Sequence, residues 1–185
     1  VIIPTTCGTG SEVTNISVIN RVSKGVKMGL ASDAMLADKA VLITNMLDSL
    51  PYQIFATSSI DAMVHSVESF LSPNACSISR LFSKEALRLI LICWKKSVEA
   101  GGGDAWKNYA AEFLKASNWA GVGFGYGGCA AVHACAYPLG SVYHIPHGQS
   151  NQLMFKDVMK KYKEIQPEGK INELEAVIAE VLEET

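Results

Sequence analysis

The hydrophobic pattern of this chain changes once, near residues 45–51, and this change limits the folds that the chain can adopt. Before it, short apolar or β-branched runs between Gly, Asn, Ser and Asp residues predict strands at 1–4, 12–20, 26–32 and 39–44. After it, a longer apolar period predicts helices at 52–71, 79–98 and 104–120, and in the tail from residue 169. We therefore expect a small part with strands, followed by a part that is mostly helical.

Composition narrows the class of protein. Of the 185 residues, 49% are apolar and 18% are charged, which is ordinary for a chain that buries a core. The net charge of -2, without a run of Lys or Arg, argues against binding to nucleic acid or to an anionic membrane. The apolar stretches are too short, or too interrupted by Gly, to supply the ~20 residues that cross a bilayer. The opening VIIPTT lacks Met and starts directly in a predicted strand, so we expect this sequence to be part of a longer polypeptide.

The five cysteines are odd in number, widely spaced and without a C-x-x-C pair. This pattern indicates neither a disulfide framework nor a thiolate zinc site, so we expect reduced thiols in a cytoplasmic protein.

The histidines and one aspartate form a pattern of their own. Asp61 and His65 are four residues apart in a predicted helix, so their side chains lie on one face about one turn apart. His133 and Tyr137 have the same spacing, and Pro138 is expected to end their helix before the chain reaches His147. One carboxylate and three imidazoles form a ligand set that suits Fe(II) or Zn(II).

Spacing alone leaves two interpretations open. A D-x-x-x-H pair is common by chance, and a single buried histidine is more often a hydrogen-bonded core residue than a ligand. The second cluster favours a shared metal, because His133 and His147 lie on either side of a Pro-Gly turn among small and apolar residues.

Three segments then carry a family resemblance: PTTCGTGSEVT at 4–14, SSIDAMVHSVES at 58–69 and HACAYPLGSVYHIPHGQSN at 133–151. Their order and spacing resemble the signatures of the iron-dependent, group III alcohol dehydrogenase family. The resemblance implies an α/β nucleotide-binding lobe, of which residues 1–48 are a remnant, followed by an all-α metal-binding lobe, truncated, over residues 49–185. This is the dehydroquinate synthase-like, iron-containing alcohol dehydrogenase fold. By the resemblance, the metal ligands are Asp61, His65, His133 and His147.

The segment PTTCGTGSE offers hydroxyl groups beside glycines that allow a close backbone approach. From the residues alone it is a loop that caps a helix. The resemblance implies contacts with a nicotinamide cofactor, NAD(H), from Thr5, Thr6, Thr9, Val18 and Lys27, the last at the ribose. The glycine-rich pyrophosphate loop of the family is expected upstream of Val1. GVGFGYGG at 121–128 follows a predicted helix rather than a strand, so we expect close helix packing there instead of a dinucleotide site.

The implied activity is hydride transfer between a primary alcohol and the nicotinamide cofactor. Several segments resemble members that interconvert 4-hydroxybutyrate and succinate semialdehyde, and His144 is a candidate partner for the substrate carboxylate. Tyr137 stands where many relatives have a proton-relaying His, so it is a candidate catalytic residue, and a packing aromatic is the alternative. The expected partners are a small alcohol or aldehyde and further copies of the chain, as a homo-oligomer.

Three other functions stay open. A member of the same family acting on an uncharged alcohol or diol, such as butanol, 1,3-propanediol or lactaldehyde, has the same motifs. A metal-dependent hydrolase with Glu68 as general base needs the same ligands. The chain by itself is also compatible with an inactive metal-binding fragment.

Overall fold

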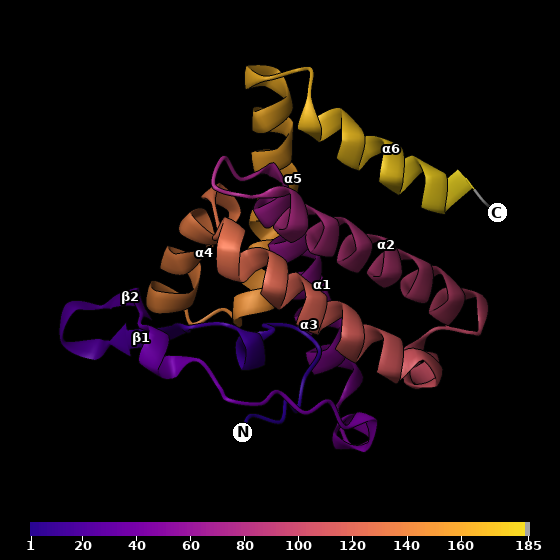
Figure 1. Cartoon of the computed structure of the whole chain (residues 1–185), viewed down its shortest axis with the longest axis horizontal. Coiled ribbons are helices and arrows are strands. Elements are labelled where there is room, and N and C mark those ends of the chain that lie inside the picture. The colour runs from indigo at the N-terminus through magenta and orange to yellow at the C-terminus, as the bar shows by residue number, and fades with distance from the viewer. Residues whose placement is uncertain (184–185) are drawn as a thin grey trace.

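The computed structural model describes residues 1–183 and consists mainly of helices, with one small sheet (Figure 1). The strands are β1 (Ile16–Arg21) and β2 (Val26–Ala31). The α-helices are α1 (Tyr52–Leu71), α2 (Ser77–Glu99), α3 (Ala110–Gly127), α4 (Ala131–Val142), α5 (His147–Ile165) and α6 (Lys170–Glu183). Short 3-10 turns occur at Ser11–Val13, Val22–Lys24, Asp33–Met35, Thr44–Leu47 and Gly103–Tyr109.

Local sequence explains where the first two long helices begin and end. α1 starts directly after Pro51 and stops at Leu71, because Ser72 precedes Pro73 and such a residue is forced toward an extended backbone. α2 starts with a capping box, in which the Cys76 sulfur accepts from the Ser79 N–H and the Ser79 hydroxyl accepts from the Cys76 N–H. The predicted bounds of α1 are confirmed, and α2 begins two residues earlier than expected.

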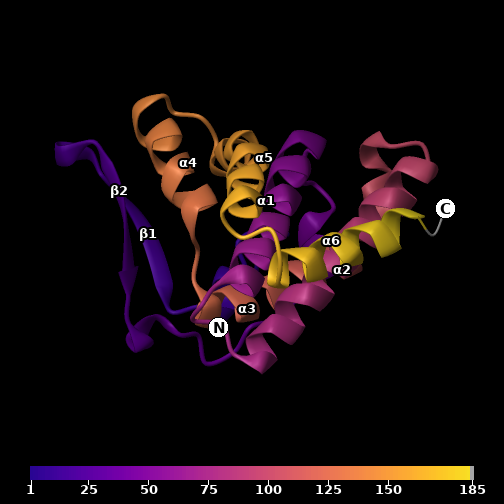
Figure 2. The same cartoon turned by 90° about the horizontal axis from the view of Figure 1, so that it is seen from above.

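The core lies where α1, α2 and α3 pack against one another. Phe55 stacks on Trp106 with a ring-centroid distance of 4.0 Å and meets Phe113 edge-on at 4.8 Å. A second apolar cluster of Val67, Phe70, Leu87 and Leu174 attaches α6 to α1 and α2. Figure 2 shows α4 between the hairpin of β1 and β2 and the pair α1 and α5, an arrangement that the contacts of α4 with both sides support.

The first 44 residues contain less sheet than their pattern predicts. Only β1 and β2 form an antiparallel hairpin, whose turn includes Gly25 in the left-handed region at φ 61. Segments 1–4 and 39–44 meet through a single parallel bridge, Ile2 with Ala40. Apolar side chains in these segments stay exposed, and a strand pattern becomes a sheet only when neighbouring strands cover it.

Two further expectations are wrong in detail. The segment from Asp104 begins as a 3-10 turn, and α3 starts only at Ala110. Pro138 does not end its helix but lies inside α4, where it costs one backbone hydrogen bond rather than the whole helix. In contrast, Gly121, Gly123 and Gly127 lie in α3 against neighbouring segments, as expected for close helix packing. Within residues 1–183 no helix is long and apolar enough to cross a membrane.

We predict that Gly121→Ala destabilises the protein, because its new Cβ would lie 2.5 Å from the Gly10 carbonyl oxygen and 2.8 Å from the Gly10 Cα. Both are backbone atoms that cannot move aside, so we expect the free energy of unfolding to fall by about 1–3 kcal/mol. Gly125→Ala is the matched control on the same helix, since its Cβ would meet atoms no closer than 3.8 Å. That change should be neutral or stabilising by up to about 1 kcal/mol. Urea unfolding followed by circular dichroism measures both, and equal effects would contradict the prediction.

Candidate metal centre

One face of α1 carries three buried ionisable side chains. Asp61, His65 and Glu68 follow one another at i, i+4 and i+7, so they line up along the helix. They are 3%, 4% and 0% exposed. Such burial requires partners for the charged groups, and these come from α4 and α5.

His133 comes from the first turn of α4 and is 2% exposed, and His147 is the first residue of α5. The start of α5 can approach α1 because residue 148 is glycine: a Cβ there would collide with the backbone of Thr57. Pro146 thus precedes the first residue of α5, and Gly148 lets the start of α5 lie against α1.

The side chains of Asp61, His133 and His147 converge. Asp61 Oδ1 lies 3.6 Å from His133 Nε2 and 3.5 Å from His147 Nε2. Their three ligand atoms all lie within 4.8 Å of one another, close enough to bind one ion. Three of the four predicted ligands are therefore grouped around one point.

His65, the fourth predicted ligand, lies beside this group. Its ring stacks on that of His133 at 4.6 Å between centroids, and its Nδ1 is 4.0 Å from Asp61 Oδ2. With His133 it also forms a second group within 4.8 Å that includes the thiol of Cys129. The sequence motifs predict no cysteine ligand, and Cys129 comes close to the two histidines only through the fold.

Asn151 is a functional candidate that sequence reasoning missed. It is fully buried, and its Nδ2 lies 2.7 Å from Asp61 Oδ1, 3.1 Å from His133 Nε2 and 3.4 Å from His147 Nε2. Its amide nitrogen thus reaches all three converging ligand atoms. The available signal was its position four residues after His147, which places both side chains on one face of α5.

The imidazoles differ in how they bind protons. Burial lowers the pKa of His65 to about 4 and also lowers that of His147, so both are neutral at pH 7. Burial acts in the same direction on His133, but its side-chain hydrogen bonds with Asp61, Cys129 and Glu68 outweigh burial and raise its pKa to about 12. The pKa of Asp61 is lowered, because the surrounding histidines outweigh the effect of its burial.

A cavity of about 530 Å³ opens beside this cluster. Its walls include His65, Cys129, His133, Tyr137 and His147, together with Thr9, Val18 and Lys27. The structure therefore brings three of the five predicted cofactor contacts, and the candidate catalytic Tyr137, to the same space as the candidate ligands.

Three predicted site residues do not line this cavity. Thr5 and Thr6 belong to the irregular N-terminal segment and are not among the residues that line the cavity. His144 is exposed in the turn between α4 and α5, with a positive φ of 57, so the structure does not support its role beside the substrate.

The residues present fit a divalent metal. Among the described residues, the buried His65 Nδ1 has no hydrogen-bond partner, an arrangement that a bound ligand would relieve. A carboxylate with imidazoles is a donor set that both Fe(II) and Zn(II) accept, so the donor set does not distinguish the two metals.

We predict that metal binding releases a proton near pH 7, because a ligand must be a neutral imidazole while the groups around His133 raise its pKa above that of a free imidazole. The affinity for Zn²⁺ should then rise about tenfold per pH unit between about pH 6 and pH 8. Calorimetric titration in two buffers of different ionisation enthalpy counts the proton. His144→Ala is the control and should change neither value, whereas a pH-independent affinity of the unaltered protein would contradict the prediction.

Comparison with known proteins identifies the family of this chain. Residues 55–184 match the family model described as Fe-containing alcohol dehydrogenase family, C-terminal, and residues 1–44 match the model described as iron-containing alcohol dehydrogenase. The chain is 44% identical to 4-hydroxybutyrate dehydrogenase of Clostridium kluyveri over 182 residues, which are 98% of this chain and 49% of that protein. It thus spans about half the length of this relative.

Solved structures of alcohol dehydrogenases and related reductases have a similar fold. The iron-containing alcohol dehydrogenase of Thermotoga maritima superposes with a TM-score of 0.84 at 30% identity, over 98% of this chain and 49% of that one. Sulfoacetaldehyde reductase of Bifidobacterium kashiwanohense, solved with NAD⁺, superposes with a TM-score of 0.77 at 28% identity, over 85% and 41%. The resemblance and the fold that it implies are confirmed. The chain belongs to the iron-containing alcohol dehydrogenase family.

Proposed function

We propose that this chain forms the metal-binding part of an NAD-dependent oxidoreductase that interconverts a primary alcohol and its aldehyde. One observation carries the proposal: the candidate ligand atoms of Asp61, His133 and His147 converge at one point, and His133 and His147 line a cavity together with Lys27 and Tyr137. Family membership supports it, because the named relatives are alcohol dehydrogenases or aldehyde reductases.

Asp61, His65, His133 and His147 would hold the metal, Fe(II) or Zn(II). When bound, it would supply Lewis acidity toward the oxygen of the alcohol or aldehyde, and the nicotinamide would supply the hydride chemistry. Thr5, Thr6, Thr9, Val18 and Lys27 stay the proposed cofactor contacts. Support for NAD comes from the NAD⁺-bound structural relative and from the position of Thr9, Val18 and Lys27 on the cavity wall.

The proposed substrate pair is 4-hydroxybutyrate and succinate semialdehyde, which the similarity to 4-hydroxybutyrate dehydrogenase supports. Lys27 supports an anionic substrate or cofactor, because it brings a positive charge to the cavity. Its ammonium group lies close to Gly140 of α4, and its charge contributes to lowering the pKa of His147.

Tyr137 is the proposed proton carrier. Its ring lies 6.5 Å from that of His147, and burial is the largest cause that raises its pKa. The phenol therefore keeps its proton at pH 7 and would act as a donor and relay through its hydroxyl rather than as a free base.

Metal and activity should disappear together. We expect Asp61→Asn and His147→Ala to lower the metal content of anaerobically purified protein at least about tenfold, because the first replaces the carboxylate by a neutral amide and the second removes an imidazole of the converging group. Activity is measured with NAD⁺ and 4-hydroxybutyrate, 1-butanol or 1,3-propanediol, and His144→Ala is the control that should keep its metal. Unchanged metal in both ligand variants would refute the site. Activity that depends strictly on NAD(H) would exclude a hydrolase, and faster turnover of the uncharged alcohols would overturn the proposed substrate.

Replacing Tyr137 tests proton relay. Tyr137→Phe should lower turnover by about 100-fold while leaving the metal content unchanged, because only the hydroxyl is lost. Tyr137→His should recover part of the activity and move its pH profile toward lower pH, since imidazole titrates near pH ~6.5. If the Phe variant turns over at the original rate, Tyr137 is only a packing aromatic.

A further inference from the structure

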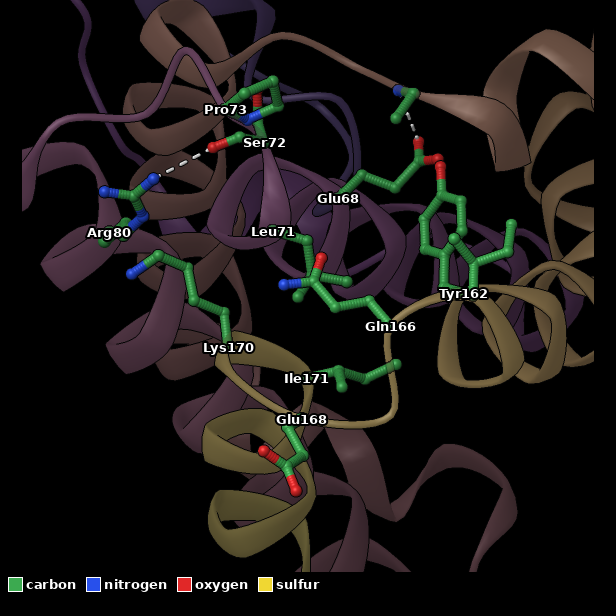
Figure 3. A pocket seen from close by; sticks show the side chains of 12 residues that line it. Glu68, Leu71, Ser72, Pro73, Arg80, Tyr162, Gln166, Glu168, Lys170 and Ile171 are labelled. Carbon is green, nitrogen blue, oxygen red and sulfur yellow. Dashed lines mark hydrogen bonds between the residues drawn. The ribbon is translucent and has the colours of Figure 1, made fainter.

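Glu68 stands where α1 meets the beginning of α4, and it has three polar partners. Its Oε2 lies 2.6 Å from His133 Nδ1 and accepts from the Ala130 N–H at 3.1 Å. Its Oε1 accepts from the Val132 N–H at 2.6 Å. In Figure 3 the carboxylate points away from Arg80 and toward Tyr162, whose hydroxyl accepts from the Ala131 N–H at 3.1 Å.

This environment accounts for a fully buried carboxylate. The first N–H groups of a helix have no partner within the helix, and the helix dipole makes that end favourable for a negative charge. Glu68 and Tyr162 together satisfy three successive N–H groups at the start of α4. Glu68 does not line the cavity that contains Tyr137, so its position does not suit the general base of a hydrolase.

The same carboxylate decides which way the His133 ring presents its nitrogens. An ionised carboxylate only accepts hydrogen bonds, so the short contact requires a proton on Nδ1. The other nitrogen, Nε2, then faces Asp61 Oδ1 at 3.6 Å, within the converging ligand group. A neutral imidazole with its proton on Nδ1 has its lone pair on Nε2, which is what a metal ligand requires.

We propose that Glu68 is a positioning residue of the metal centre: it selects the His133 tautomer that offers Nε2 to the metal and anchors the helix that carries His133. The inference rests on the proposed function, because it assigns a role around the metal proposed there. Hydrogen-bonded carboxylates behind metal-binding histidines typically contribute 10–100-fold to metal affinity.

Glu68→Gln is the test, since it keeps the size of the side chain but turns one of its two acceptor atoms into a donor. That donor must face an N–H group of either His133 or Val132, so the arrangement cannot be satisfied in full. We expect the affinity for Zn²⁺, measured by competition with a chelator, to fall about 10–100-fold.

Tyr162→Phe is the matched control. It removes one hydrogen bond from the same helix start but leaves the contact between Glu68 and His133 intact. Its Zn²⁺ affinity should stay within about threefold of the original, since the loss is one neutral hydrogen bond away from the ligands. An equal loss in both variants would show that Glu68 only stabilises α4, and an unchanged affinity in Glu68→Gln would overturn the proposal.

Nitrogen-15 NMR of the histidine rings shows which ring nitrogen carries a proton and which binds the metal. A residue that only stabilised α4 would not determine this. In the Zn²⁺-loaded, unaltered protein, His133 should carry its proton on Nδ1 and bind zinc through Nε2. Zinc on Nδ1, or a bare Nδ1, would overturn the proposal even if Glu68→Gln does not fold. If the unaltered protein binds no Zn²⁺, the proposed metal centre itself fails, which distinguishes the two outcomes.

Discussion

The burial of the Asp61 carboxylate is the constraint on which the rest of the site depends. A charge that is 3% exposed must be matched by polar or charged partners, or its burial would cost several kcal/mol. α4 supplies His133 and α5 supplies His147 and Asn151, all within reach of one carboxylate oxygen. The helices therefore meet around a polar centre, while their apolar faces pack elsewhere.

Small residues allow the helices to come this close. Glycine at position 148 lets the first turn of α5 rest on the backbone of α1 at Thr57. Further along α1, Gly127 of α3 packs against Ser69, and the Ser69 and Ser83 hydroxyls lie 2.7 Å apart between α1 and α2. Tight packing limits side-chain movement, so the candidate ligand atoms are held in place by backbone contacts as well as by hydrogen bonds.

Much of the fold could be predicted from sequence, because helical periodicity is a local property. The bounds 52–71 of α1 match the pattern, since apolar spacing and the proline at each end act within a few residues. The strand pattern of 1–4 and 39–44 was less informative, because a strand needs a covering neighbour that local sequence does not specify. The sequence around Pro138 predicts a helix end, although α4 continues through it, since a helix supported by tertiary contacts tolerates one missing hydrogen bond.

For the site, the sequence by itself determined the residue types and their local spacing: Asp61 and His65 one turn apart, then His133 and His147 on either side of a turn. Only the tertiary structure decided which atoms meet. The contacts of Asn151 with Asp61 and of Glu68 with His133 join residues 90 and 65 positions apart. No periodicity reports such pairs, because they follow from how three helices pack and not from the residues adjacent to each one. For the same reason Lys27 reaches the cavity while His144, three residues before the proposed ligand His147, is exposed.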